Sequence, residues 1–190
     1  MKKINYKETF EIVCRLYVFF FLTFYGLGKV IGAQFYMPGS IPDEIAQMPI
    51  GLVPDFELAW VFMGRSYGYM LFIGLAEVIG AILLLFNKTK LIGTLILIPI
   101  MVNVIVFDIF FLDEYGALAG ATLYLLMLLT ILFINKEKIS KLLIELISAK
   151  KIPQISFKEK LIKYSIVLAI IILIFIGDQL VVNFLGYGKG

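Results

Sequence analysis

Ionisable side chains stand inside the apolar runs of this sequence. Glu77 lies within FIGLAEVIGAILLLF, and Arg15 and Lys29 lie fourteen residues apart in the first apolar run. A charge in hydrocarbon costs roughly 2.5 kcal/mol or more even on lenient insertion scales, so such residues usually face a bundle interior and have a partner. These three residues could hold an anion, pass a proton, or only fix how helices pack.

An inner charge pair is predicted from the expected heights of these residues. Arg15 and Glu77 fall in the same half of the membrane, so we expect Arg15 and Glu77 to form this pair. Glu11, four residues before Arg15, is a nearer competitor for the arginine. A purely structural pair and a proton-passing pair both remain open.

A second polar group is expected near the opposite boundary, with both cations and carboxylates at one depth. The cations of this group could attract a small anion or the polar head of a quinone, and Asp108 would balance their charge. Solvation at the interface is the structural alternative. The candidate residues are Lys29, Gln34, Arg65, Asn103, Asp108 and Asp178.

Glycine spacing predicts close helix approach at this same depth. Three small-xxx-small pairs fall toward these helix ends: Gly28 with Gly32, Gly64 with Gly68, and Gly116 with Gly120. Trp60, by contrast, is interpreted as an interfacial belt residue rather than part of a quinone pocket.

Composition restricts the chemistry. The 190 residues are 61% hydrophobic and 16% charged, with one cysteine and no histidine, and the mean hydropathy is +0.98. These values are typical of a membrane protein. They argue against a metal site of the usual kind, a haem held by histidine, an internal disulfide or a covalently bound cofactor. The net charge of +3 gives no reason to expect nucleic acid as a partner.

Five apolar segments are each long enough to cross about 30 Å of hydrocarbon. They lie at residues 10–32, 58–86, 91–112, 116–134 and 161–185. We therefore predict an all-α, polytopic membrane helix bundle, with one membrane domain over residues 1–190. Arg15 interrupts the first segment, which favours a retained helix over a signal peptide.

The connections give the orientation. Lysines are concentrated before the first span, between the second and third spans, and in residues 136–160, which predicts a cytoplasmic N-terminus and an external C-terminus in the bacterial inner membrane. Residues 36–57 contain four prolines and are predicted to be an outer loop, either a cap over a site or a plain surface loop. In residues 136–160, apolar residues at helical spacing predict an amphipathic helix on the membrane surface.

A family resemblance follows from several stretches. RLYVFFFLTFYGLGK, Gln34, WVFMGRSYGYMLFIGLAEVIGAILLLFNKTKLIG and MVNVIVFD together resemble the DoxX-like family of small bacterial membrane proteins, over about residues 11–134. The resemblance implies a four-helix core, with the fifth helix as an extension. The positions that carry over are Arg15, Lys29 and Glu77, then Arg65, Asn103 and Asp108.

The resemblance also implies a function. Some relatives are subunits of thiosulfate:quinone oxidoreductase, and others are linked to membrane redox complexes. We therefore expect an accessory or quinone-linked subunit that acts with a redox partner protein in the lipid bilayer. A non-enzymatic scaffold or assembly factor is the alternative, and a small transporter is a weaker one. Catalysis, catalytic residues and homo-oligomer formation are left open.

Overall fold

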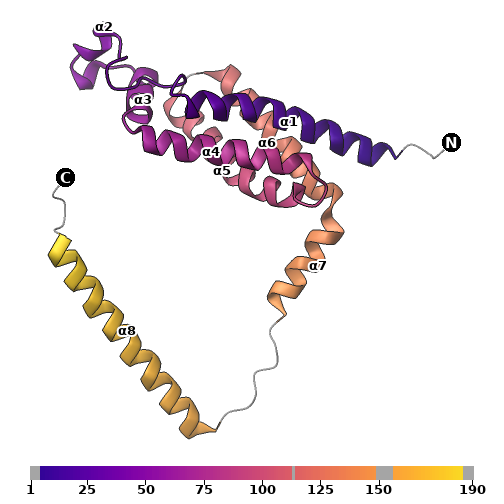
Figure 1. Cartoon of the computed structure of the whole chain (residues 1–190), viewed down its shortest axis with the longest axis vertical. Helices are drawn as coiled ribbons and strands as arrows, with labels where there is room; N and C mark the ends of the chain where they lie inside the picture. The colour runs from indigo at the N-terminus through magenta and orange to yellow at the C-terminus, as the bar shows by residue number, and fades with distance from the viewer. Residues whose placement is uncertain (1–4, 113, 149–155, 186–190) are drawn as a thin grey trace. The chain divides into compact units, whose positions relative to one another are not determined.

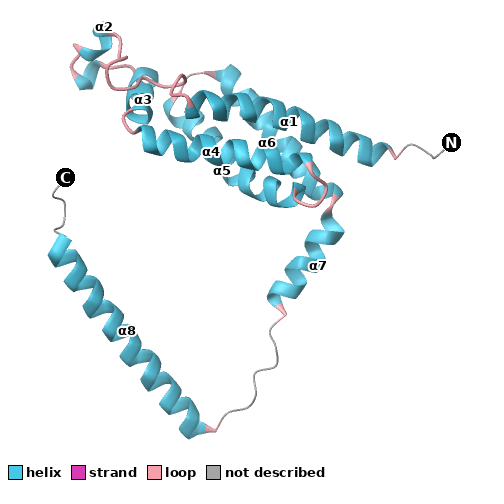
Figure 2. Ribbon diagram, in the orientation of Figure 1, coloured by secondary structure: helices cyan, strands magenta, loops and turns pink. Residues whose placement is uncertain are grey.

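All regular elements of the described residues are helices (Figures 1 and 2). The computed structural model describes residues 5–112, 114–148 and 156–185. The helices are α1 (Tyr6–Val30), α2 (Asp43–Ala46), a 3-10 helix (Ile50–Leu52), α3 (Asp55–Gly64), α4 (Tyr67–Leu85), α5 (Lys90–Phe111), α6 (Tyr115–Ile134), α7 (Lys136–Ile147) and α8 (Phe157–Leu185). Five of them, α1, α4, α5, α6 and α8, are long and apolar enough to span a membrane.

Helices α1, α4, α5 and α6 form a four-helix bundle. Helix α1 packs against α4 and α6, and α5 packs against the same two helices. Short connections make α4, α5 and α6 successively antiparallel. The start of α4 lies beside the end of α1, where the Tyr67 hydroxyl donates to the carbonyl oxygen of Val30 at 2.9 Å. Fully buried apolar side chains fill the centre, among them Val18, Leu84, Leu97 and Leu128. The bundle is therefore of the up-down-up-down type.

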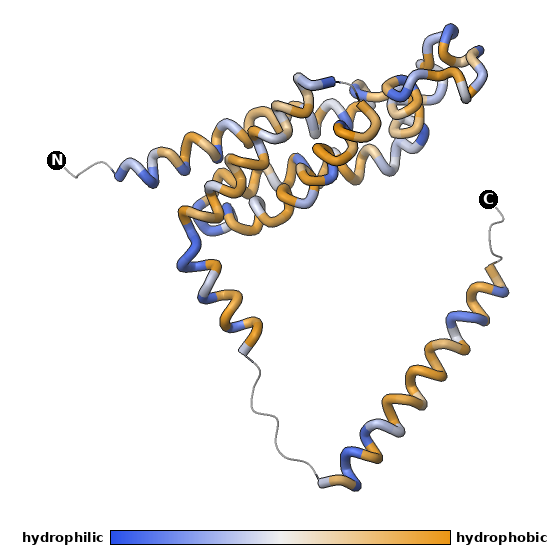
Figure 3. The backbone as a smooth tube through the Cα atoms, turned by 180° about the vertical axis from the view of Figure 1, so that it is seen from behind, coloured by the Kyte–Doolittle hydropathy of each residue, from blue (hydrophilic) through white to orange (hydrophobic). Residues whose placement is uncertain are grey.

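Large apolar side chains also cover the outside of the bundle. Phe20, Phe24, Phe72 and Phe110 are each more than half exposed, and hydrophobic residues make up most of the length of the long helices (Figure 3). A water-soluble surface does not carry apolar area on this scale. The surface is compatible with a multi-pass membrane protein.

The second predicted span, residues 58–86, is wrong at its start. The structure divides it into α3 and α4, with a break at Arg65 and Ser66. The Ser66 hydroxyl accepts a hydrogen bond from the Tyr69 amide and caps the N-terminus of α4. The membrane-length helix therefore begins at Tyr67, nine residues later than predicted. The predicted loop of residues 36–57 likewise contains α2, the 3-10 helix and the start of α3.

Helix α1 ends in a glycine motif. Gly32 has a φ of +72°, a conformation that favours glycine. The Gly32 amide donates to the carbonyl of Lys29, and the Ala33 amide donates to that of Gly28. This is the Schellman arrangement, and it ends α1 at Val30, directly after Lys29.

Close helix approach occurs at different glycines from those predicted. A Cβ on Gly26 would lie 2.8 Å from the carbonyl oxygen of Gly74, and a Cβ on Gly93 would lie 2.6 Å from that of Gly80. By contrast, no heavy atom outside the local backbone lies within 4 Å of a Cβ added to Gly68 or Gly116. The remaining predicted positions include Gly64, whose contact is with the backbone of Tyr36 in the loop rather than with a second helix.

The chain divides into two units, residues 1–143 and 144–190. In the first unit, Ile139 near the start of α7 packs against the bundle core. Of the predicted amphipathic segment 136–160, Lys136–Ile147 forms α7, with Leu142, Leu146 and Ile147 exposed, and residues 149–155 lie outside the described residues. In the second unit, α8 is apolar along most of its 29 residues and Asp178 is exposed on it.

Candidate functional site

The bundle has two polar ends. We call the end with the start of α1, the α4–α5 turn and the end of α6 the basic end; its charged residues include Lys7, Lys88, Lys90 and Lys136. The opposite end, with the end of α1, α3 and the α5–α6 turn, is the acidic end; its charged residues include Asp43, Glu44, Asp55, Glu57 and Glu114. Arg65 also lies there, at the junction of α3 and α4.

Arg15 caps a helix at the basic end. Its Nε donates to the carbonyl oxygen of Leu84 at 2.5 Å, and Nη2 donates to that of Leu85 at 2.6 Å. Nη1 donates to Oδ1 of Asn87 at 2.7 Å. Because the last carbonyls of a helix have no partner within the helix and carry partial negative charge, a guanidinium there stabilises the end of α4.

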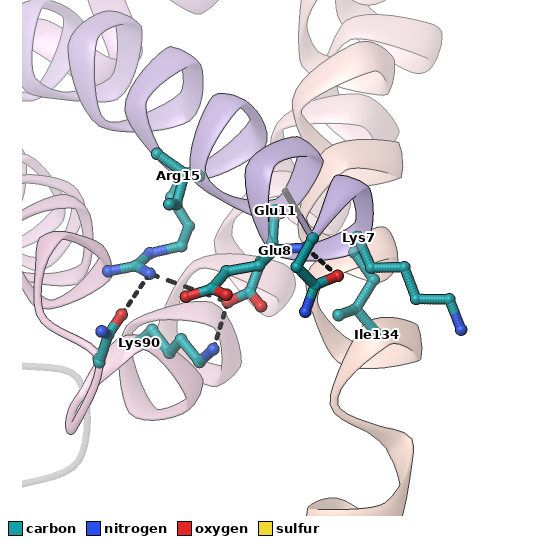
Figure 4. A pocket seen from close by; sticks show the side chains of 9 residues that line it. Lys7, Glu8, Glu11, Arg15, Lys90 and Ile134 are labelled. Carbon is teal, nitrogen blue, oxygen red and sulfur yellow. Dashed lines mark hydrogen bonds and ion pairs between the residues drawn. The ribbon is translucent and has the colours of Figure 1, made fainter. Parts of the chain in front are cut away.

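Glu11 completes this basic-end network. Its Oε1 lies 3.9 Å from Nη1 of Arg15 and also forms an ion pair with Nζ of Lys90, so charge rather than a directed hydrogen bond holds this oxygen. Figure 4 shows the three side chains turned toward one another. They border a cavity of about 460 Å³ lined by Asn5, Lys7, Glu8, Glu11, Ile12, Arg15, Asn87, Lys90 and Ile134.

The partner of Glu77 is Lys29. Nζ of Lys29 donates to both carboxylate oxygens of Glu77, at 3.0 and 2.8 Å, and the two residues are 6% and 1% exposed. The predicted pairing of Arg15 with Glu77 is therefore wrong. The reason is the direction of side chains on antiparallel helices.

Side chains of an α-helix lean toward its N-terminus. On α1 this direction is the basic end, and on α4 it is the acidic end. Lys29 near the end of α1 and Glu77 in the middle of α4 therefore lean toward each other. Arg15 and Glu77 lean apart, which leaves Arg15 to reach the end of α4.

Helices α1 and α4 cross at Gly26 and Gly74, beside this ion pair. We call this point the glycine crossing. A Cβ on Gly74 would lie 2.7 Å from the carbonyl oxygen of Gly26 and 2.9 Å from Cβ of Lys29, and a Cβ on Gly26 would lie 3.2 Å from Cβ of Glu77. The close approach of the two backbones at this point brings the ion pair together.

Asp108 is a third buried charge near this pair. It is 4% exposed, and Lys29 is close enough to act on its carboxylate electrostatically. No lysine or arginine nitrogen of the described residues lies within 4.0 Å of it, however. Its Oδ2 is buried and accepts no hydrogen bond within the part of the chain that the structure describes.

The remaining members of the predicted outer group do not gather around Lys29. Arg65 and Asn103 are exposed. Asp178 belongs to the second unit. Gln34 instead lines a separate cavity at the acidic end.

This second cavity, which we call the aromatic cavity, has a volume of about 450 Å³. Its lining residues are Phe24, Tyr25, Gly28, Ala33, Gln34, Phe56, Trp60, Leu112, Glu114 and Ala117. The Trp60 ring stacks on Phe56 with centroids 4.1 Å apart and meets the edge of Phe35 at 5.1 Å. Oε1 of Gln34 is buried and has no hydrogen-bond partner among the described residues.

Sequence reasoning missed this cavity because it divided α3 between the predicted loop 36–57 and the predicted span 58–86. Phe56 and Trp60 are four residues apart, which places both on one face of α3. Pro54, directly before α3, was the available signal for a separate helix start. The segment between Pro38 and Pro54 contributes no lining residue, and Phe56 is the residue of the predicted loop 36–57 that lines the cavity.

Fold and composition define the class of protein: a helical protein with five helices compatible with multiple passes through a membrane, and with buried charges inside its bundle. The chain is 36% identical over 132 residues to the uncharacterized protein YwoB of Bacillus subtilis (strain 168), a match that covers 70% of this chain and 80% of that protein. The chain belongs to the family of YwoB. No family model and no solved structure matches the chain.

Proposed function

We propose that this protein is a DoxX-like accessory subunit of a membrane redox system and that the aromatic cavity binds the head of a quinone. The observation that carries the proposal is the unpartnered Oε1 of Gln34 in a cavity walled by Phe24, Phe56 and Trp60. A cavity of about 450 Å³ is within the usual size of small-molecule sites, which combine apolar walls with a few polar groups.

The chemistry of a quinone suits this lining. Its head is a flat ring that packs against aromatic side chains, and its polar atoms lie at the ring edge. The oxidised head offers carbonyl acceptors and the reduced head offers hydroxyl donors. An amide carries both an NH₂ donor and a carbonyl acceptor, so Gln34 can bind either form.

The geometry favours a quinone head over a small anion. Lys29 already donates to both oxygens of Glu77, and Arg65 is exposed on another segment. Neither cation lines the aromatic cavity, and the charged residue among its described lining residues is Glu114. An anion would therefore find no positive partner there.

We also propose that the protein lies in the bacterial cytoplasmic membrane with its basic end inside. The lysines of the α4–α5 turn and of α7 support this orientation. The aromatic cavity would then lie at the outer boundary, where a quinone head can reach it from the lipid and a redox partner protein can reach it from outside.

Fluorescence of Trp60 tests the quinone site, because Trp60 is the one tryptophan of the chain and lines the cavity. The full chain in lipid nanodiscs is titrated with a short-chain benzoquinone and, separately, a naphthoquinone. Saturable quenching is expected. Gln34→Leu should weaken binding about tenfold, which corresponds to one lost hydrogen bond of about 1.4 kcal/mol. Its stability should change by less than about 0.5 kcal/mol, because an unpartnered acceptor is replaced by an apolar group.

Two controls separate binding from collision in the lipid. Asn103→Leu removes an exposed amide of α5 outside the cavity and should leave the titration unchanged. A Trp60→Phe, Phe133→Trp double variant moves the reporter to an exposed site near the basic end and should show only linear quenching. Equal quenching of both reporters, or an unchanged titration in Gln34→Leu, would sink the quinone site.

A scaffold or assembly factor is the second candidate function. It is favoured by the intramembrane cations, since both Arg15 and Lys29 are held by groups of this chain. It predicts a stable complex with a partner protein and no bound quinone. Purification in native lipid followed by mass spectrometry of proteins and quinones distinguishes the two candidates.

A further inference from the structure

The buried charges of the acidic half do not balance. Lys29, Glu77 and Asp108 are 6%, 1% and 4% exposed, which places one cation against two carboxyl groups. Lys29 gives hydrogen bonds to both oxygens of Glu77. Oδ2 of Asp108 receives none from any described residue. An ionised carboxylate that is buried without a hydrogen bond or ion pair costs several kcal/mol, so Asp108 needs an occupant.

The surrounding helices supply no second buried cation. Helix α6 contains no Asp, Glu, Lys or Arg, only Tyr115 and Tyr124 as titratable groups, and Glu77 is the only charged residue of α4, with Tyr67 and Tyr69 at its start. The other charged groups of the elements around α5 lie toward the two ends of the bundle: Asp55 and Glu57 on α3, Arg65 before α4, Glu114 before α6, and Lys90 at the start of α5 itself. On α1, Lys7, Glu8, Glu11 and Arg15 lie toward the basic end, and Tyr25 lies between them and Lys29.

We propose that the Lys29–Glu77–Asp108 cluster is a binding site for one exchangeable proton, which is carried by Asp108. A proton needs a single acceptor, and Oδ2 of Asp108 is one. A metal cation needs several oxygen ligands, and no group of three or more metal-binding side chains exists among the described residues. With the proton bound, the cluster is neutral: Lys29 and Glu77 balance each other and Asp108 carries no charge.

The aromatic cavity gives this site a route to the acidic end. Leu112 lines the cavity, and its amide donates to the backbone carbonyl of Asp108 at 3.1 Å, so the two residues are one helical turn apart. Gly28, which precedes Lys29, lines the cavity as well. None of the three cluster residues lines the cavity itself, but these neighbours on α1 and α5 do, and we place the exchange of the proton on that side. This inference does not depend on what the cavity binds.

Infrared spectroscopy of the full chain in nanodiscs, without any quinone, tests the proton site. At neutral pH the wild-type protein should show the carbonyl stretch of a protonated carboxyl group, and the band should shift when H₂O is replaced by D₂O. Asp108→Asn should remove the band. Asp55→Asn, which changes an exposed aspartate at the same end, should leave it unchanged.

Glu77→Gln provides a second test that does not require Asp108 to be changed. Without the Glu77 carboxylate, Lys29 becomes the partner of Asp108, so Asp108 should ionise and the band should disappear at neutral pH. A band that persists in Asp108→Asn or in Glu77→Gln, or that never shifts in D₂O, would overturn the proposal. Loss of the band when NaCl replaces KCl at constant pH would also overturn it, because the occupant would then compete with Na⁺.

Discussion

The two ends of the bundle differ in how many partners their buried polar groups have. At the basic end, Arg15 has four partners, namely Leu84, Leu85, Asn87 and Glu11, and Glu11 is also paired with Lys90. Oε1 of Glu11 accepts no hydrogen bond by itself, but two cations hold it. Toward the acidic end, Oε1 of Gln34 and Oδ2 of Asp108 are buried with neither a hydrogen bond nor an ion pair among the described residues. Buried polar atoms are almost always satisfied in native proteins, so unsatisfied ones call for an explanation.

The difference separates structural charges from candidate functional ones. The basic end has its own cavity, but Arg15, its most deeply placed cation, already donates hydrogen bonds to the C-terminus of α4. In the acidic half, Gln34 lines the aromatic cavity, and Asp108 lies one helical turn before the lining residue Leu112. A charge inside the membrane is therefore not by itself a sign of a ligand site. A buried acceptor that has neither a hydrogen bond nor an ion pair is a stronger sign of such a site.

Removing Lys29 should have the largest effect on stability. Lys29→Met leaves Glu77 and Asp108 without any buried cation, and loss of one partner of a buried ion pair costs about 3–5 kcal/mol. The measurement is the free energy of unfolding in mixed detergent micelles with increasing SDS. The double variant Lys29→Met, Glu77→Leu should recover a large part of the loss. No recovery would show that the pair is not the reason for it.

Removing Arg15 should have a somewhat smaller effect. Arg15→Met frees the carbonyls of Leu84 and Leu85, and loss of hydrogen bonds from a charged donor is expected to lower the free energy of unfolding by about 3 kcal/mol. Water at the basic end can solvate the freed groups in part. Hydrogen exchange should increase in the last turn of α4 and not at its start, near Ser66. Equal exchange at both ends would contradict a capping role.

The glycine crossing should show the smallest effect of the three. Gly74→Ala places a Cβ 2.7 Å from the carbonyl oxygen of Gly26, and such overpacking costs about 1–3 kcal/mol. Gly68→Ala is the matched control on the same helix, with open space around it. It should be neutral or stabilising by up to about 1 kcal/mol, because alanine favours helix over glycine. If the two variants behave alike, close contact of α1 and α4 at Gly74 is not needed.

Much of the fold could be predicted because it depends on local composition. Five long apolar helices follow from run length, and a partner for Glu77 follows from the cost of an isolated charge in hydrocarbon. The break at Arg65 and Ser66 was readable in principle from a serine cap, but the apolar residues on both sides hid it. The glycine pairs gave a wrong prediction of where helices meet, because many spacings fit the small-xxx-small pattern. The point at which α1 and α4 cross decides that Gly26 and Gly74 are the glycines in contact.

The sequence by itself determined that this protein has charges buried between membrane-length helices, because hydropathy and the cost of desolvation are local properties of the chain. Only the tertiary structure decided which charges meet. The antiparallel crossing of α1 and α4 makes Lys29 and Glu77 lean toward each other, and it turns Arg15 to the end of α4. Asp108 is then left beside a cation that already has a partner, because contacts between helices depend on crossing point and direction, which no single segment encodes.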